Sequence, residues 1–330
     1  MKKRLFLIFS IFFILSILFV PNANISYANE DYVYLGGNSA GFSLTTRGAY
    51  VLGVGEVIAK NGSISPAKDA GIMSGDIILT INENEVNTAS DIEENIENYN
   101  IVDLTIKRDD EIIYKKVAPV KDLSGKKKLG LFIRDSINGI GTLTFIKNRK
   151  FASLGHPIVC DNGEILEIID GRLYNCNITS IKKGIKNIPG ELSGVFNKDK
   201  IVGKINKNKI SGVYGEISDR YDLSKHKKIL VGEAKMGKAK IVSTINGETP
   251  KEYNISIIKT DEGVADSKNF VVKITDKNLL EKTGGIVQGM SGSPIIQEGK
   301  IVGAITHVFI NDPTRGYGIS INNMLLENNQ

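Results

Sequence analysis

The sequence predicts a mostly β protein with two domains. Of its 330 residues, 34 are glycine and none is tryptophan, and β-branched residues are frequent, a composition suited to strands and turns. In the later part of the chain, short apolar runs recur about every ten residues with turn signals between them, as in a barrel or sandwich. A chain of this length has room for two hydrophobic cores.

The N-terminus has the form of a secretory leader over residues 1–28. Lys2-Lys3-Arg4 precedes an apolar run over 5–20, and Ser26 and Ala28 supply small residues at the −3 and −1 positions of a cleavage site. The run is long for a cleaved signal and short for a spanning helix. We therefore predict export, followed either by release or by retention on a membrane anchor.

The remaining composition argues against nucleic-acid and metal binding. The formal net charge is +5, and the leader carries three of these charges, which leaves too little for a nucleic-acid surface. Cys160 and Cys176 are the only cysteines, and although they could pair, we expect ordinary free or buried thiols. His156 and Cys160 form the only close pair of metal-ligating type and have no third ligand nearby, so neither a metal nor another cofactor is predicted.

The first domain should contain a short helical turn, a strand, a helix and a hairpin. Ser65 caps the turn and Pro66 occupies its first position, while Gly71 ends it. The predicted later elements are listed here: a strand over 77–81, a helix over 89–99 with Ile92 and Ile96 on one face, and a hairpin of 104–107 with 112–117.

This order of elements, with the string Ser-Pro-Ala-x-x-Ala-Gly-Ile-x-x-Gly-Asp-x-Ile-Leu from Ser65 to Leu79, resembles a PDZ domain of bacterial proteases. The resemblance implies a β-sandwich with two helices, which we place at residues 29–119. PDZ domains bind an extended peptide by adding a strand to an open sheet edge. The carboxylate-binding loop is expected near 35–42. Alternatively, the domain only packs on the second domain.

The second domain is predicted over residues 120–330, with a lysine-rich linker at 120–128. Strands are expected at 142–146, 165–169, 194–196, 212–214, 229–231, 239–244, 252–258 and 270–274, and a helix at 321–327.

A serine between glycines is the candidate nucleophile of this domain. Gly289-Met290-Ser291-Gly292 precedes a hydrophobic hairpin over 295–305. Glycine at 289 would let the N–H groups of Gly289 and Ser291 converge as an oxyanion hole. The alternative is an ordinary glycine-serine turn between two strands.

Three histidines are candidates for the general base. His156 lies in a glycine-proline turn, which can aim a loop side chain into a cleft. His307 lies in the strand after the serine and is expected to be a neighbour of the site. His226 lies between lysines and is expected to be solvated. We therefore predict His156 as the base.

The acid that orients the base is predicted to be Asp276, which ends an apolar strand shortly before Ser291. Asp170, Asp199 and Asp222 are the alternatives, each in or near a turn. The order His156, Asp276, Ser291 matches chymotrypsin-like enzymes, although the acid lies unusually near the serine.

Several strings together resemble the stage IV sporulation protein B peptidases: 129–136, 139–145, the Leu-Gly-His turn, 284–295 and Asn-Asp-Pro-Thr-Arg-Gly within 306–318. The resemblance implies a chymotrypsin-like double β-barrel with His156, Asp276 and Ser291 as catalytic residues. It also implies a sporulation protease, exported across the forespore membrane into the intermembrane space. Such a protease cuts itself and a regulatory subunit of a membrane complex, which releases intramembrane processing of a mother-cell sigma factor precursor. The PDZ domain would bind the protein's own N-terminal segment.

Two other functions compete with this interpretation. A quality-control protease of the high-temperature-requirement type has its PDZ domain after the catalytic domain, whereas here it comes first. A catalytically idle PDZ scaffold would only tether membrane partners, and an intact serine, histidine and acid argue against it.

Overall fold

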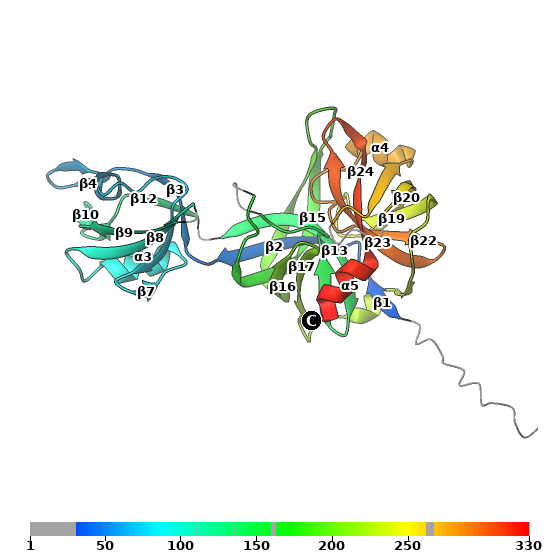
Figure 1. The fold of residues 1–330 in the computed structure, drawn as a ribbon, viewed down its shortest axis with the longest axis horizontal. Coiled ribbons are helices and arrows are strands. Elements are labelled where there is room, and N and C mark those ends of the chain that lie inside the picture. The colour runs from blue at the N-terminus through cyan, green and yellow to red at the C-terminus, as the bar shows by residue number, and fades with distance from the viewer. Residues whose placement is uncertain (1–30, 110, 135, 160–162, 262–266, 330) are drawn as a thin grey trace, which may run out of the picture. The chain divides into compact units, whose positions relative to one another are not determined.

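The computed structural model describes residues 31–109, 111–134, 136–159, 163–261 and 267–329, and it is mostly β, as predicted (Figure 1). The predicted leader and Cys160 lie outside the described residues. Within the described ranges, no helix is long and apolar enough to cross a membrane.

The first barrel of the second domain closes on itself. β13 pairs with β2 on one side and with β14 on the other, which completes a ring of antiparallel strands. In ring order the strands are β14 (Lys150–Ser153), β17 (Gly212–Ile217), β16 (Glu191–Lys209), β15 (Ile168–Lys182), β2 (Ser39–Thr46) and β13 (Ile137–Lys147).

A second barrel closes in the same way through the pairing of β23 with β24. In ring order its strands are β23 (Lys300–Phe309), β22 (Pro294–Gln297), β19 (Gly237–Ser243), β20 (Lys251–Thr260), β21 (Phe270–Ile274) and β24 (Asp312–Ser320). β1 (Tyr32–Leu35) and β18 (Lys228–Val231) connect the rings, since β1 pairs with β13 and β18 with β23. Outside the strands lie η1 (Leu223–Lys225), α4 (Lys277–Thr283) and α5 (Ile321–Asn329).

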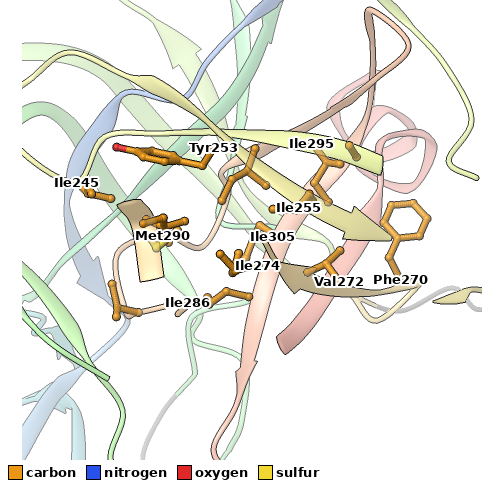
Figure 2. Packing of buried hydrophobic residues seen from close by; sticks show 14 of the residues in the cluster. Ile245, Tyr253, Ile255, Phe270, Val272, Ile274, Ile286, Met290, Ile295 and Ile305 are labelled. Carbon is orange, nitrogen blue, oxygen red and sulfur yellow. The ribbon is translucent and has the colours of Figure 1, made fainter. Parts of the chain in front are cut away.

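The core of the second barrel holds the serine loop in place. Figure 2 shows Met290 among the isoleucines and valine of this core, including Ile255, Ile274 and Ile305. Met290 is fully buried, and burying a methionine side chain is worth about 1.5–3 kcal/mol. The residue next to Ser291 therefore anchors the loop in the hydrophobic core.

The PDZ domain has its own sheet, and β12 lies at one edge of it. The sheet order is β12 (Leu131–Arg134), β3 (Ala49–Val54), β6 (Ile77–Ile81), β8 (Val102–Arg108) and β9 (Glu111–Val117), with β7 (Asn84–Glu85) paired to β6. The other elements are β4 (Val57–Ala59), β5 (Gly62–Ile64), α2 (Pro66–Asp69), α3 (Ala89–Ile96), β10 (Val120–Lys121) and β11 (Lys127–Lys128).

Local chemistry explains the elements predicted for this domain. Thr88 and Asp91 form a capping box at the start of α3, and Ile92 and Ile96 are its buried face. Asp76 is fully buried; its carboxylate pairs with the Arg108 guanidinium at 2.6 Å and accepts a hydrogen bond from the Met73 N–H at 3.0 Å. These contacts fix the turn into β6.

The structure moves the expected domain boundaries. β1 and β2, which we predicted within the PDZ domain, pair in the large sheet of the second domain. The expected linker at 120–128 contains the β10–β11 hairpin, and Leu129 after it is buried in the PDZ core. The PDZ sheet thus lies in the chain between β2 and β13. Strand pairing is decided by contacts distant in sequence, so the apolar character of β2 alone did not indicate its sheet.

Candidate functional site

The serine loop has a backbone that requires glycine on both sides of Ser291. Gly289 and Gly292 have φ values of 97° and 91°. A Cβ on Gly292 would lie 2.2 Å from the carbonyl oxygen of Thr142, so no larger residue fits. Ser291 is half-buried, and its hydroxyl donates a hydrogen bond to the Thr306 carbonyl at 2.7 Å.

Two buried threonines of β13 fix this loop from the other barrel. The Thr142 hydroxyl donates to the Gly289 carbonyl at 2.9 Å, and the Thr142 N–H donates to the Ser291 carbonyl at 2.9 Å. The Thr144 hydroxyl donates to the Gly292 carbonyl at 2.8 Å. The N–H groups of Gly289 and Ser291 make no hydrogen bond to any described residue. These two donors therefore remain available for an oxyanion.

We did not predict the role of the two threonines from the sequence. The available signal was a pair of hydroxyl residues two positions apart in an apolar strand, which places both side chains on one face. Buried hydroxyls of this kind need a partner, but the sequence does not show that the partner is the serine loop.

His156 follows β14 in a turn with left-handed backbone at Leu154 and Gly155. Its Nδ1 lies 2.8 Å from the Pro157 carbonyl oxygen. Because a carbonyl can only accept, Nδ1 carries the proton and Nε2 is left as the basic nitrogen. Burial lowers the pKa of His156 from its ordinary value of 6.5, although the hydrogen bond to Pro157 raises it. The imidazole is therefore held in its neutral form.

His156 and Ser291 line the same pocket, which has a volume of about 290 Å³. The other lining residues are Phe42, Ile137, Gly139, Ile140, Leu154, Ile158, Gln288 and Gly289. The imidazoles of His156 and His307 lie against each other, with ring centroids 4.7 Å apart. His307 is thus a neighbour of the site, as we expected.

Asp276, our predicted third member, is not brought to this pocket. It is the N-cap of α4, where its carboxylate accepts hydrogen bonds from the Leu279 N–H at 3.0 Å and the Asn254 N–H at 3.2 Å. An aspartate between a strand and a helix is equally a capping signal, and capping is the role seen here. Among the described residues that line the pocket, none is a carboxylate.

The alternative acids and the third histidine lie elsewhere. Asp170 pairs with Arg172 and Lys204 on the surface. The carboxylate of Asp222 caps η1, and Asp199 does not line the pocket.

His226 is half-buried and not simply solvated, contrary to our expectation. Its Nε2 lies 2.9 Å from the Tyr221 hydroxyl, and its Nδ1 lies 2.8 Å from the Leu35 carbonyl oxygen. The imidazole therefore connects β1 to the segment before β18.

Cys176 is buried and free, and burial raises the pKa of its thiol to about 11. A thiol with that pKa is protonated at neutral pH and unreactive. The described residues contain no cluster of ligands suited to a metal ion.

The PDZ domain has a groove of about 550 Å³ between edge strand β12 and helix α3. Its apolar lining includes Ile92, Ile96, Leu131 and Ile133, and Lys128 at its rim is ion-paired with Glu93. We had expected the carboxylate-binding loop near 35–42, but those residues belong to the large sheet of the second domain. The groove is instead lined by the string Leu129-Gly130-Leu131-Phe132, which leads into β12.

Two closed barrels, with Ser291 on a glycine turn of one and His156 after a strand of the other, define a chymotrypsin-like serine peptidase. The family model described as SpoIVB peptidase S55 matches residues 125–325, and the chain belongs to this family. A PDZ domain model matches residues 38–118. No curated protein matches the chain.

Three solved structures are similar to parts of the chain. The PDZ domain of an SdrC-like protein from Listeria monocytogenes is 22% identical with a TM-score of 0.23, over 28% of this chain and 93% of that one. The inactive form of the Rv3671c protease from M. tuberculosis is 12% identical with a TM-score of 0.35. The match covers 58% of this chain and 85% of that one. A thermostable serine protease, AL20, from an extremophilic microorganism is 7% identical with a TM-score of 0.35. The match covers 58% of this chain and 92% of that one.

Proposed function

We propose that this protein is an exported signalling serine endopeptidase of sporulation, with Ser291 as its nucleophile and His156 as its general base. The observation that carries the proposal is the shared pocket of the two side chains beside two free N–H donors of a rigidly held loop. Membership of the SpoIVB peptidase family supports the sporulation role, and the leader-like N-terminus supports export.

The proposed reaction begins with transfer of the Ser291 proton to His156 Nε2 while Oγ bonds to the substrate carbonyl carbon. The N–H groups of Gly289 and Ser291 stabilise the oxyanion. The imidazolium then donates its proton to the leaving amine as the C–N bond breaks. Water, deprotonated by the same nitrogen, then attacks the acyl carbon, and the imidazolium returns this proton to Oγ as the ester bond breaks, which releases the acid and regenerates the Ser291 hydroxyl. The Pro157 carbonyl accepts the hydrogen bond from Nδ1 and so keeps the imidazole in one tautomer throughout the reaction. In a catalytic triad a carboxylate has this role.

In the resting arrangement, the Ser291 hydroxyl donates to the Thr306 carbonyl. Proton transfer to His156 therefore requires the serine side chain to rotate about its Cα–Cβ bond. Such a resting state suits a protease whose activity is released by a signal, and it also favours the idle-scaffold alternative. Activity measurements separate the two.

We propose that the PDZ groove binds one extended peptide along β12, either the protein's own N-terminal segment or the tail of its substrate. An edge strand that pairs on one side only among the described residues, beside an apolar helix face, suits this mode of binding. The substrates would be the protein itself and a regulatory protein of a membrane complex. Because both peptides would occupy the same groove, they should compete.

The test is labelling of the full chain with a fluorophosphonate, together with self-cleavage. Wild type should label and cut itself, whereas Ser291→Ala and His156→Ala should each lose about 10³-fold or more in rate. His226→Ala serves as the control histidine and should label normally. An unlabelled, uncut wild type would favour the scaffold, and an active Ser291→Ala variant would exclude this serine.

A further inference from the structure

The pocket beside Ser291 and His156 has an apolar wall that the chemistry above does not use. Phe42, Ile137, Ile140, Leu154 and Ile158 contribute aliphatic and aromatic surface. The polar members, apart from the two reacting residues, are Gln288 and backbone. Among the described residues of the lining, none is an aspartate, glutamate, lysine or arginine. A charged substrate side chain would therefore lose its hydration here without gaining a partner.

The size and position of the pocket point to a single substrate side chain. Its volume of about 290 Å³ lies just below the range of small-ligand sites. Because the nucleophile and the base both line it, a side chain that fills the pocket must come from a residue next to the scissile bond.

Gly139 keeps one wall of this pocket open. It lies directly opposite Phe42 in the β13–β2 ladder, so a side chain at 139 would lie on the same face of the sheet as Phe42. A Cβ built at Gly139 meets no atom within 4 Å, and its backbone is not in the left-handed region. A larger residue can therefore be introduced there without backbone strain.

We propose that this pocket selects substrates with an uncharged aliphatic or aromatic side chain next to the scissile bond, and that the missing side chain of Gly139 sets the size it accepts. The inference rests on the proposed peptidase function of the same site. It narrows the substrate class to peptides with a large apolar residue at the cut.

The test uses the full chain and a mixture of synthetic decapeptides that vary both residues flanking each bond, with cleavage products identified by mass spectrometry. Wild type should cut next to Leu, Ile or Phe at least about 10-fold faster than next to Asp or Lys, since even one missing methylene in an apolar pocket lowers the rate about 10–200-fold. Gly139→Leu should reverse the preference toward Ala and Gly. Asn138→Leu, at the neighbouring exposed position of β13 that does not line the pocket, is the matched control and should cut like wild type.

Fluorophosphonate labelling of Ser291 separates the failure of this inference from failure of the proposed function. The reagent reacts with the Ser291 hydroxyl itself, so a Gly139→Leu variant that labels has kept its nucleophile and base, whatever its peptide preference. Equal cutting next to charged and apolar residues, or an unchanged preference in a labelled Gly139→Leu variant, would overturn the pocket assignment. Absence of labelling in wild type would overturn the peptidase function and this inference with it.

Discussion

The hydroxyl of Thr142 should matter more for catalysis than for folding, and Thr142→Val tests this directly. Valine keeps the shape of the side chain and retains the N–H that donates to the Ser291 carbonyl. It removes only the 2.9 Å hydrogen bond to the Gly289 carbonyl. Gly289 is one of the two residues whose N–H groups we propose as donors to the oxyanion. The substitution therefore releases one end of the oxyanion loop without opening a cavity.

The expected magnitude follows from what is left unpaired. A buried carbonyl without its donor costs about 1–3 kcal/mol of stability. Removal of one oxyanion donor lowers kcat about 10²–10³-fold. A substitution that loosens the donor without removing it should lower kcat by less. We therefore expect kcat to fall by about 10-fold, with KM little changed, because the interaction acts in the transition state.

The measurement is steady-state cleavage of a peptide by the full chain, together with urea unfolding. Thr142→Ser should restore kcat because it restores the hydroxyl. Thr244→Val is the matched control, since this buried threonine also donates to a glycine carbonyl, that of Gly37 at 2.9 Å, away from the pocket. It should lose similar stability and keep its kcat. Equal losses of kcat in both variants would refute the reasoning, because the effect would then be a general loss of packing.

Three further predictions follow from individual side chains. Burial lowers the pKa of His156 below 6.5, and only the neutral imidazole accepts a proton. We therefore expect kcat/KM to fall as the pH drops, with a midpoint below pH 6.5. A midpoint above pH 6.5 would contradict the assignment of His156 as the base. Asp276→Asn should keep kcat because asparagine also caps a helix, whereas Asp276→Ala should lose about 0.5–2 kcal/mol of stability; a large loss of kcat in the asparagine variant would show that the charge acts in catalysis. Asp76→Ala removes the partner of half-buried Arg108 and should lower the free energy of unfolding by about 1.5–3 kcal/mol. The loss should appear as faster hydrogen exchange in β6, while fluorophosphonate labelling of Ser291 stays normal.

Features set by neighbouring residues were predictable from the sequence. The β22–β23 hairpin after Ser291, the strand β6 and the helix α3 all arise from short-range signals, and the structure confirms their presence, although α3 ends at Ile96, three residues before its predicted end. The glycine pattern around Ser291 indicated its turn for the same reason, since only glycine tolerates the backbone at 289 and 292.

Features set by distant contacts were not predictable in this way. The apolar residues of β2 suit burial in either sheet, and only pairing with β13 and β15 decides between them. Asp276 has the local signature of a cap and of a catalytic acid at once, and only the hydrogen bonds to Leu279 and Asn254 distinguish the roles. The contact of Thr142 with Gly289 joins residues 147 positions apart in the chain.

The position of the PDZ domain between β2 and β13 has a consequence for how the protein can be rebuilt. These strands are antiparallel neighbours, and Leu44 pairs with Ile137; opposed residues in such a ladder lie about 4.5–5.5 Å apart. A two-residue turn could therefore join them directly as a β-hairpin. The PDZ domain occupies the place of a hairpin loop, so it can be excised or exchanged for another peptide-binding cassette while every strand of the first barrel is retained.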